Sequence, residues 1–291
     1  MKPLIERLVA AQGRWAKPFG EFNHRWLQAL FRPITPVRDF LNGRWLGHPL
    51  HSVLTDAPIG ILFLVILFDL AGQPLAAHTQ AILLVGILTM VAAAFAGLAD
   101  YSDTDGTARE RATIHGTLMT IALLLYIASW ALRQGGHPAW SAAVILSVLG
   151  FLVVAAGAFV GGNVVYVFGN MVSRHAFRGG GTKWIAMEPA EVDDAGNVPE
   201  GRLVKAKVGI NTLVLVREGE RILAIHDTCA HAGGPLSGGM LEDGCVVCPW
   251  HGSKFQMTDG RAQRGPTLYD QPAYEVRRTD AGGWEARRKS N

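Results

Sequence analysis

Two segments indicate the fold of the C-terminal half of the chain: Cys229-Ala-His-Ala-Gly-Gly-Pro-Leu236 and Cys248-Pro-Trp-His-Gly-Ser-Lys-Phe255. Each contributes one cysteine and one histidine, and sixteen residues lie between His231 and Cys248. Thiolate sulfur and imidazole nitrogen are strong ligands for transition metals, and the flanking glycines and prolines indicate tightly turned loops. The pattern therefore predicts a metal centre shared by two loops.

Other uses of these cysteines fit the spacing less well. Zinc fingers pair two cysteines and then two histidines on a helix, whereas here each segment holds one of each. A disulfide between Cys229 and Cys248 is disfavoured on the cytoplasmic side of a membrane, where this half is expected to lie. Cys245 and Cys248 form a Cys-x-x-Cys pair, but the apolar run around them indicates a strand in which Cys245 is a buried thiol.

The two segments resemble the Rieske family in ligand spacing and in their glycine and proline positions, and the resemblance covers roughly Lys183 to the C-terminus. It implies a two-iron two-sulfur cluster. The expected ligands are Cys229 and Cys248 on one iron and His231 and His251 on the other. Imidazole ligands raise the reduction potential above that of an all-cysteine cluster.

Residues beside the ligands distinguish subtypes of the family. Rieske subunits of quinol-oxidising complexes have two further cysteines that bridge the loops, and Gly234 and Trp250 occupy those positions here. Ser253 stands where those subunits have a hydroxyl donor to a cluster sulfur, while Phe255 replaces their tyrosine. The resemblance therefore implies a ferredoxin-like centre of low to intermediate potential. The expected cluster-tuning residues are Ser253, Trp250, Gly233 and Gly252.

Short apolar runs between glycines and charges predict an antiparallel β domain around these loops. The expected strands are 203–208, 213–217, 222–226, 245–248 and 274–278. Only 40 residues follow His251 (291 minus 251), too few for the mononuclear-iron domain of a ring-hydroxylating oxygenase. No nucleotide-binding loop or nucleophile motif is evident, so an electron-transfer component is expected rather than an autonomous enzyme.

The N-terminal half is apolar, which explains a chain that is 49% hydrophobic and only 18% charged. Four stretches each have the length of about 20 residues that spans a bilayer: 52–72, 79–99, 113–132 and 141–161. The expected fold is an all-α four-helix transmembrane bundle followed by an all-β domain. The expected parts are a basic segment at 1–45, the bundle at 46–172, a linker at 173–182 and the Rieske domain at 183–291.

Basic residues predict how the bundle is oriented, because short flanks rich in lysine and arginine stay in the cytoplasm. Those flanks contain Lys2, Arg7, Arg14, Lys17, Arg25, Arg32, Arg38, Arg44, Arg109, Arg111, Arg174, Arg178 and Lys183. The opposite loops contain only Arg133. Both termini and the Rieske domain are therefore expected on the cytoplasmic side of a bacterial inner membrane. The small net charge of +3 gives no case for nucleic-acid binding.

The basic segment at 1–45 has two readings. Apolar residues alternate with basic ones near its start, and five aromatic residues follow between Trp15 and Phe31. This pattern fits a segment lying in the lipid interface with its rings at headgroup depth. It fits equally well a cytoplasmic helix packed on its own protein.

The bundle contains an internal repeat. A shift of 64 positions (115 minus 51) places His51 on His115, and it also aligns the small-residue runs 91–97 and 155–161. Each repeat would be one hairpin that enters from the cytoplasm and returns to it. The two histidines would then face each other at equal depth near the cytoplasmic surface.

The bundle also resembles a bacterial family of four-helix membrane proteins of unknown function, through Gly47-His-Pro-Leu-His51, 56–60, 97–101 and His115. That resemblance implies no activity. The ionisable residues expected to gather toward one leaflet are His48, His51, His115, Asp56 and Asp100. They indicate either a site for a b-type haem, a quinone or a metal, or a polar network that pins helix ends together.

Two function classes follow. In the first, the Rieske centre exchanges single electrons with a membrane carrier, haem or quinone, or with a soluble redox partner. In the second, the cluster reports redox state as a sensing or assembly module, and the bundle only anchors it. The lipid bilayer is a partner in both.

Overall fold

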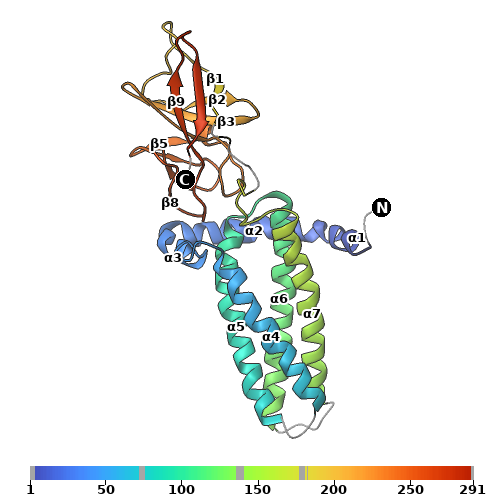
Figure 1. Ribbon diagram of the computed structural model, residues 1–291. Coiled ribbons are helices and arrows are strands. Elements are labelled where there is room, and N and C mark those ends of the chain that lie inside the picture. The colour runs from blue at the N-terminus through green and yellow to red at the C-terminus, as the bar shows by residue number, and fades with distance from the viewer. Residues whose placement is uncertain (1–3, 72–75, 136–140, 177–180, 182, 290–291) are drawn as a thin grey trace. The chain divides into compact units, whose positions relative to one another are not determined.

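The computed structural model describes residues 4–71, 76–135, 141–176, 181 and 183–289 (Figure 1). The chain divides into two compact units, Met1–Asn170 and Met171–Asn291. The first is called the helical unit and the second the β unit. Part of the expected linker, at 177–180 and 182, lies outside the described residues.

Four long helices form the core of the helical unit. They are α4 (Leu50–Ala71), α5 (Ala76–Ser102), α6 (Gly106–Leu132), which continues into η3 (Arg133–Gly135), and α7 (Ala142–Tyr166). Each is long and apolar enough to cross a membrane. The four spans expected from the sequence are confirmed, and every helix extends beyond its expected bounds at one or both ends.

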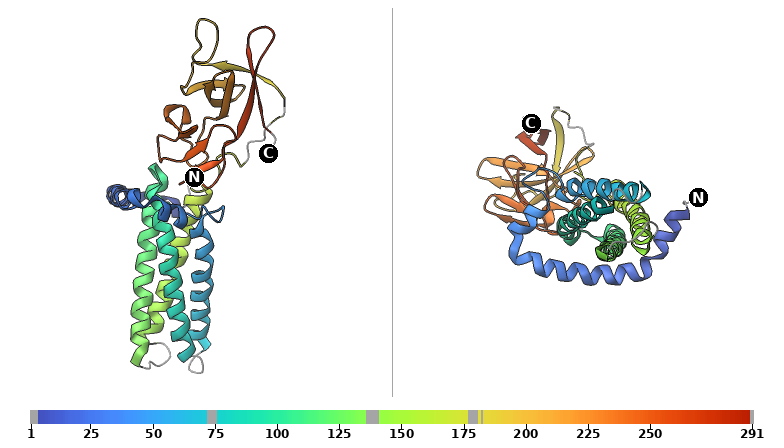
Figure 2. Two further views of the ribbon diagram at one scale, coloured as in Figure 1. Left: turned by 90° about the vertical axis from the view of Figure 1, so that its left-hand side faces the viewer. Right: turned by 90° about the horizontal axis from the view of Figure 1, so that it is seen from below.

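The four helices form two hairpins of the same construction. Helix α4 packs mainly on α5 and α6 on α7, with smaller contacts between α5 and α6 and between α4 and α7. Helices α4 and α6 therefore lie on one diagonal of the bundle, as the end-on view of Figure 2 shows. A Cβ at Gly86 would stand 2.8 Å from Leu62 Cδ2, and one at Gly150 would stand 3.1 Å from the Tyr126 ring. The two contacts are equivalent in the repeat, because Gly150 and Tyr126 each lie 64 positions after Gly86 and Leu62.

Shorter helices lie across one end of the bundle (Figure 1). They are α1 (Leu4–Ala11), α2 (Gly13–Phe31), η1 (Arg32–Ile34) and α3 (Thr35–Leu41). One face of α2 contacts the bundle, where Tyr101 Oη donates to the Gly20 carbonyl at 3.1 Å. Its other face exposes Trp15, Phe19, Phe22, Trp26 and Leu30. The segment is thus packed on its own protein along one side and presents an apolar stripe along the other.

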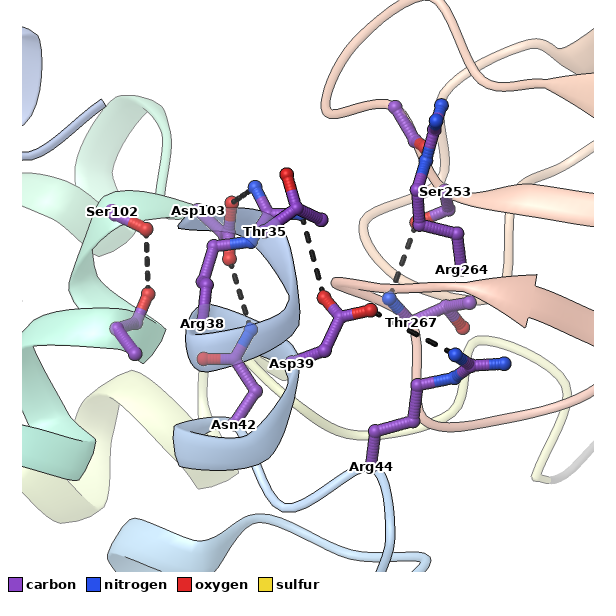
Figure 3. A network of polar contacts seen from close by, with 12 residues as sticks. Thr35, Arg38, Asp39, Asn42, Arg44, Ser102, Asp103, Ser253, Arg264 and Thr267 are labelled. Atoms are coloured by element: carbon purple, nitrogen blue, oxygen red, sulfur yellow. Dashed lines mark hydrogen bonds and ion pairs between the residues drawn. The ribbon is translucent and has the colours of Figure 1, made fainter. Parts of the chain in front are cut away.

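A buried polar network holds α3 in place (Figure 3). The Asp103 carboxylate accepts from Arg38 Nη1 at 3.4 Å and from Asn42 Nδ2 at 3.1 Å. Burial raises the pKa of Asp103 to about 7, although Arg38 and the hydrogen bond from Asn42 act in the opposite direction. The network therefore contains a carboxyl group that titrates near neutral pH.

The β unit contains a closed barrel and a smaller sheet. The barrel order is β1 (Ile185–Pro189), β10 (Trp284–Arg288), β9 (Ala273–Arg278), β4 (Arg221–His226), β3 (Asn211–Glu218) and β2 (Val204–Val208). The smaller sheet consists of β5 (Met240–Glu242), β6 (Cys245–Val247), β7 (Lys254–Gln256) and β8 (Ala262–Arg264), and the turn η4 (Leu236–Gly238) precedes it. All strand pairings are antiparallel in the described residues.

Alternating burial explains the barrel strands. In β2, Val204, Ala206 and Val208 point inward while the lysines between them are exposed. The five strands expected from the sequence are present as β2, β3, β4, β6 and β9. Strands β1, β5, β7, β8 and β10 were not expected. Strands β5, β7 and β8 have only three residues each, whereas β6, equally short, is apolar throughout. One apolar cluster of the β unit includes Val214, Ile225 and Phe255 together with Cys229 and Cys248, so the two cysteine loops pack on this core.

Candidate metal centre

The two cysteine loops have the same backbone design. Cys229 N–H donates to the Gly234 carbonyl at 2.9 Å, and Gly233 N–H donates back to the Cys229 carbonyl at 2.9 Å. In the second loop Cys248 N–H donates to the Ser253 carbonyl at 2.8 Å, and Gly252 N–H to the Cys248 carbonyl at 3.1 Å. Gly233 and Gly252 have φ values of +89° and +77°, which side chains rarely adopt. Both positions therefore require glycine.

The first loop is held by residues distant in sequence. It follows β4, and Asp227 Oδ1 accepts from Ser237 N–H at 2.7 Å. Gln271 is buried, donates to the carbonyls of His226 and Thr228, and accepts from Ala230 N–H at 2.9 Å. Gln271 was not among the expected site residues, because a single glutamine 41 positions from Ala230 forms no local motif.

The four expected ligands form two pairs, one of cysteines and one of histidines, and each pair takes one residue from each loop. Cys229 and Cys248 are buried free thiols that hydrogen-bond each other. The rings of His231 and His251 have centroids 5.0 Å apart and are nearly perpendicular, at 86°. Two imidazoles bound to one tetrahedral metal ion have centroids about 5 Å apart, given metal–nitrogen bonds of about 2 Å. The donor set thus fits two thiolates on one iron and two imidazoles on the other.

Backbone N–H groups surround the cysteine sulfurs. Those of His231 and Ala232 donate to Cys229, and those of Trp250 and His251 donate to Cys248. The hydrogen bond from the Cys229 thiol and these amides lower the pKa of Cys248 to about 7. The same thiol contact and burial raise the pKa of Cys229. Amides that favour a thiolate also stabilise a metal-bound sulfur.

The residues expected to tune a cluster lie around the ligands. A Cβ at Gly234 would stand 2.9 Å from the Trp250 ring and 3.1 Å from Cys248 Sγ, so this position has no space for a larger side chain. Ser253 is fully buried, and its Oγ accepts from Thr267 N–H at 3.2 Å (Figure 3). Its hydroxyl proton therefore points to a different acceptor. Cys245 is buried in β6 and donates to Gln256 Oε1 at 3.1 Å, as expected of a structural thiol.

The two expected histidine ligands differ in solvent exposure. His231 is 5% exposed, His251 is half-buried, and the neighbouring Trp250 is 53% exposed. The His251 loop is therefore the side on which another molecule approaches the ligands most closely.

The segment that follows the last helix packs on the first loop. Tyr269 Oη donates to the Met171 carbonyl at 3.0 Å, Arg174 N–H donates to the Ala230 carbonyl at 3.2 Å, and His175 Nε2 lies 2.9 Å from the Thr228 carbonyl. The expected linker at 173–182 thus begins with residues that contact this loop. Residues 177–180 and 182 lie outside the described part of the chain.

In the helical unit, the structure brings together two of the five ionisable residues singled out from the sequence. His51 of α4 and His115 of α6 have ring centroids 6.2 Å apart at an interplanar angle of 79°. Asp100 is buried, and its Oδ1 has no hydrogen-bond partner among the described residues. His48 and Asp56 are exposed on the surface of the unit.

Two families match the chain. Residues 188–275 match the family described as Rieske 2Fe-2S domain, and residues 47–174 match the family described as predicted membrane protein (DUF2231). Both resemblances stated from the sequence are confirmed. The chain therefore combines a Rieske electron-transfer domain with a membrane domain of four apolar helices.

Individual relatives match the β unit. The ferredoxin component of biphenyl 2,3-dioxygenase from Rhodococcus jostii (strain RHA1) is 31% identical over 80 residues, which are 28% of this chain and 75% of that protein. Apoptosis-inducing factor 3 of Mus musculus is 30% identical over 88 residues, which are 30% of this chain but only 14% of that protein. The solved ferredoxin of carbazole 1,9a-dioxygenase from Nocardioides aromaticivorans IC177 is 24% identical, with a TM-score of 0.31, and covers 35% of this chain and 99% of its own.

Proposed function

From the premise that the chain belongs to the Rieske 2Fe-2S family through its β unit, we propose that it is a membrane-anchored one-electron carrier. Its cluster is held by Cys229 and Cys248 on one iron and by His231 and His251 on the other. The observation that carries this proposal is the pairing of two buried thiols, and of two nearly perpendicular imidazoles, across two loops of the same design.

When bound, the cluster supplies a couple that accepts and returns one electron. The protein sets how readily this happens. Backbone N–H groups donate to both cysteine sulfurs, and the Ser253 hydroxyl is placed to add another donor. Donors to sulfur stabilise the more negative, reduced form and so raise the potential.

Electrons enter and leave on the side of His251. This ligand is half-buried and the adjacent Trp250 is exposed, so a partner approaches here more closely than at the buried His231. The donor is a reduced protein carrier or a quinol, which loses the electron that the centre gains. The ferredoxin components among the relatives support a protein partner.

The proposal includes a topology. The N-terminal helices with their basic residues lie at the end of the bundle where α6 begins, and Arg109 lies 3.7 Å from Glu21 of α2. Basic residues from three parts of the chain flank this end, which is retained in the cytoplasm. The protein is placed in a bacterial inner membrane, with both termini and the β unit in the cytoplasm.

The proposal also includes a second redox group in the membrane, which would carry electrons between the Rieske centre and the bilayer. Its position in this proposal is between His51 and His115, where a haem or a quinone would exchange electrons with the Rieske centre or with the bilayer's quinone pool. The apolar stripe of α2 lies at the lipid interface at this end of the bundle.

Replacement of single ligands tests the cluster assignment. We expect Cys248→Ser and His251→Ala to abolish the Rieske electron-paramagnetic-resonance signal of the purified chain, because an iron that lacks one ligand is lost to solvent. Cys245→Ser is the matched control and should keep the signal, since Cys245 lies in β6, three residues before Cys248, and its thiol donates to Gln256. A normal signal in either ligand variant would contradict the assignment.

One observation favours redox sensing as the alternative function. The segment 171–176 follows α7 directly in the chain and contacts the carbonyls of Thr228 and Ala230 beside Cys229. A change at the cluster loop would therefore act on the chain that leads to the membrane. A sensor predicts a redox-dependent change in proteolysis near 171–182, whereas a carrier predicts rapid reversible reduction by a quinol or a ferredoxin reductase.

A further inference from the structure

We propose that His51 and His115 are the two axial ligands of one b-type haem in the core of the helical unit. This inference rests on the proposed function, because it names the membrane carrier that exchanges electrons with the Rieske centre. The contacts that support it all lie within the helical unit.

Both histidines are held in the same tautomer. His51 Nδ1 lies 2.8 Å from the Ala93 carbonyl, and His115 Nδ1 lies 2.8 Å from the Gly157 carbonyl. A carbonyl oxygen only accepts, so each Nδ1 carries the proton and donates. The other ring nitrogen, Nε2, then has an unprotonated lone pair. A backbone carbonyl on Nδ1 is a usual way in which proteins orient a metal-binding histidine.

Glycines on the neighbouring helices leave room for the two imidazole rings. A Cβ at Gly97 of α5 would stand 2.9 Å from both Nδ1 and Cε1 of His51, and one at Gly161 of α7 would stand within 2.9 Å of the same two atoms of His115. Cγ is the next nearest atom, at 3.5 Å for His51 and 3.4 Å for His115, so each glycine lies against the face of the ring. A side chain at either glycine would therefore displace the imidazole from its place.

The separation of the rings fits ligands on opposite sides of one metal ion. Metal–nitrogen bonds of about 2 Å place each imidazole centroid about 3 Å from the ion, so two trans imidazoles have centroids about 6 Å apart. The measured distance for His51 and His115 is 6.2 Å, compared with 5.0 Å for the Rieske pair His231 and His251. Two trans imidazoles leave four positions of an iron in one plane, and the four nitrogens of a porphyrin fill them.

The bundle provides small residues where the edges of a porphyrin would lie. Ligands from α4 and α6, on one diagonal, set the macrocycle plane across that line, so its edges face α5 and α7. At this level α5 has the run Val-Ala-Ala-Ala-Phe-Ala-Gly (91–97) and α7 has Ala-Ala-Gly-Ala-Phe-Val-Gly (155–161). These are the helices whose carbonyls hold the two histidines.

A buried cation lies one turn from His115 on the same face of α6. The Arg111 side chain is 8% exposed, and its Nη2 lies 3.4 Å from Oε2 of Glu6, its one ion-pair partner among the described residues. Its Nε and Nη1 have no hydrogen-bond partner among the described residues. A guanidinium is well suited to bind a carboxylate, and the propionates of haem supply one.

The test uses the full chain produced with added 5-aminolevulinate and purified in detergent. We expect about one haem per chain by pyridine haemochrome assay and a low-spin, six-coordinate spectrum, as two axial histidines require. In His51→Ala and His115→Ala the bound haem should fall at least about tenfold, or become five-coordinate and high-spin, and added imidazole should restore the low-spin form. His78→Ala, an exposed histidine of α5, is the matched control.

A second pair of variants tests the geometry without removing a ligand. Gly161→Ala places a methyl group 2.8 Å from His115 Nδ1, so we expect a shifted spectrum or a loss of haem. Gly116→Ala adds a methyl group beside the same histidine, where nothing lies within 4 Å, and should leave the spectrum unchanged.

Each remaining outcome counts against the haem. Wild-type protein that contains no haem and binds no added hemin overturns the proposal, as do haem bands that persist in both alanine variants. Stoichiometric copper or zinc, lost in those variants, also overturns it in favour of a bare metal site. The Rieske signal is recorded in the same samples, so its presence without haem would leave the proposed function intact.

Discussion

Arg133 forms a bidentate ion pair with Asp69. The two residues are 64 positions apart in the sequence, the same interval that separates His51 from His115. Arg133 Nη1 lies 2.8 Å from Asp69 Oδ1, and Nη2 lies 2.7 Å from Oδ2. Each pair has one residue in each hairpin. His51 and His115 lie near the end of the bundle where α4 and α6 begin, and Asp69 and Arg133 lie at the opposite end. The single arginine in the loops opposite the basic flanks has its charge neutralised, which agrees with the proposed orientation.

We expect loss of either partner of this ion pair to destabilise the bundle. Both side chains are at least nine-tenths buried, and an unpaired buried charge costs about 3–5 kcal/mol. Asp69→Leu should therefore lower the melting temperature of the purified protein, and the double variant Asp69→Leu/Arg133→Met should recover most of the loss. The exchange Asp69→Arg/Arg133→Asp should also recover it, because the repeat makes the two positions equivalent. Equal melting temperatures in all variants would contradict the pair's role.

Ser253→Ala should lower the reduction potential of the Rieske centre. The Ser253 Oγ accepts from Thr267 N–H, so its proton is available to a cluster sulfur. Loss of a hydrogen bond to a charged acceptor, about 1.5 kcal/mol, corresponds to roughly 60 mV for a one-electron couple. Redox titration followed by electron paramagnetic resonance measures the shift. Ser237→Ala is the control, and an unchanged potential in Ser253→Ala would show that the hydroxyl points elsewhere.

Stability of the helical unit should fall as pH rises toward neutrality. Burial raises the pKa of Asp103 to about 7, well above its ordinary value of about 4. A carboxyl group with a raised pKa in the folded state favours folding while it is protonated. Its contribution is complete below about pH 4 and is lost as the pH rises through about 7, with a slope of up to about 1.4 kcal/mol per unit.

Melting curves followed by circular dichroism at a helix-sensitive wavelength measure this dependence. Asp103→Asn retains a side chain of the same shape without the titrating group, so its stability should be flat over the same range. A slope that is the same in both proteins would assign the pH dependence to another residue.

The β unit should be accessible from the cytoplasmic side only. Protease added to right-side-out cells should leave the region after Gly181 intact, whereas inverted vesicles should lose it. Immunoblotting against a C-terminal tag reports both results, and detergent-opened cells control for protease activity. Cleavage in intact cells would reverse the proposed orientation.

Much of this protein is encoded in patterns between near neighbours. The spacing Cys-x-His and Cys-x-x-His, with Gly233 and Gly252 four residues after each cysteine, specifies two loops by itself, because the turn closes within six residues. The four spans are likewise predictable, since apolar length alone decides whether a helix crosses a bilayer.

The tertiary structure decided what depends on residues far apart in the chain. Gln271 reaches the cluster loop across about 40 positions, Arg111 meets Glu6 across 105, and Arg133 meets Asp69 across 64. The histidine repeat was visible in the sequence, but its carbonyl partners Ala93 and Gly157 were not. Backbone carbonyls have no sequence signature, and a contact between distant side chains exists only after helices and strands have packed. Local pattern therefore determined the elements and the loops, while packing determined which groups surround them.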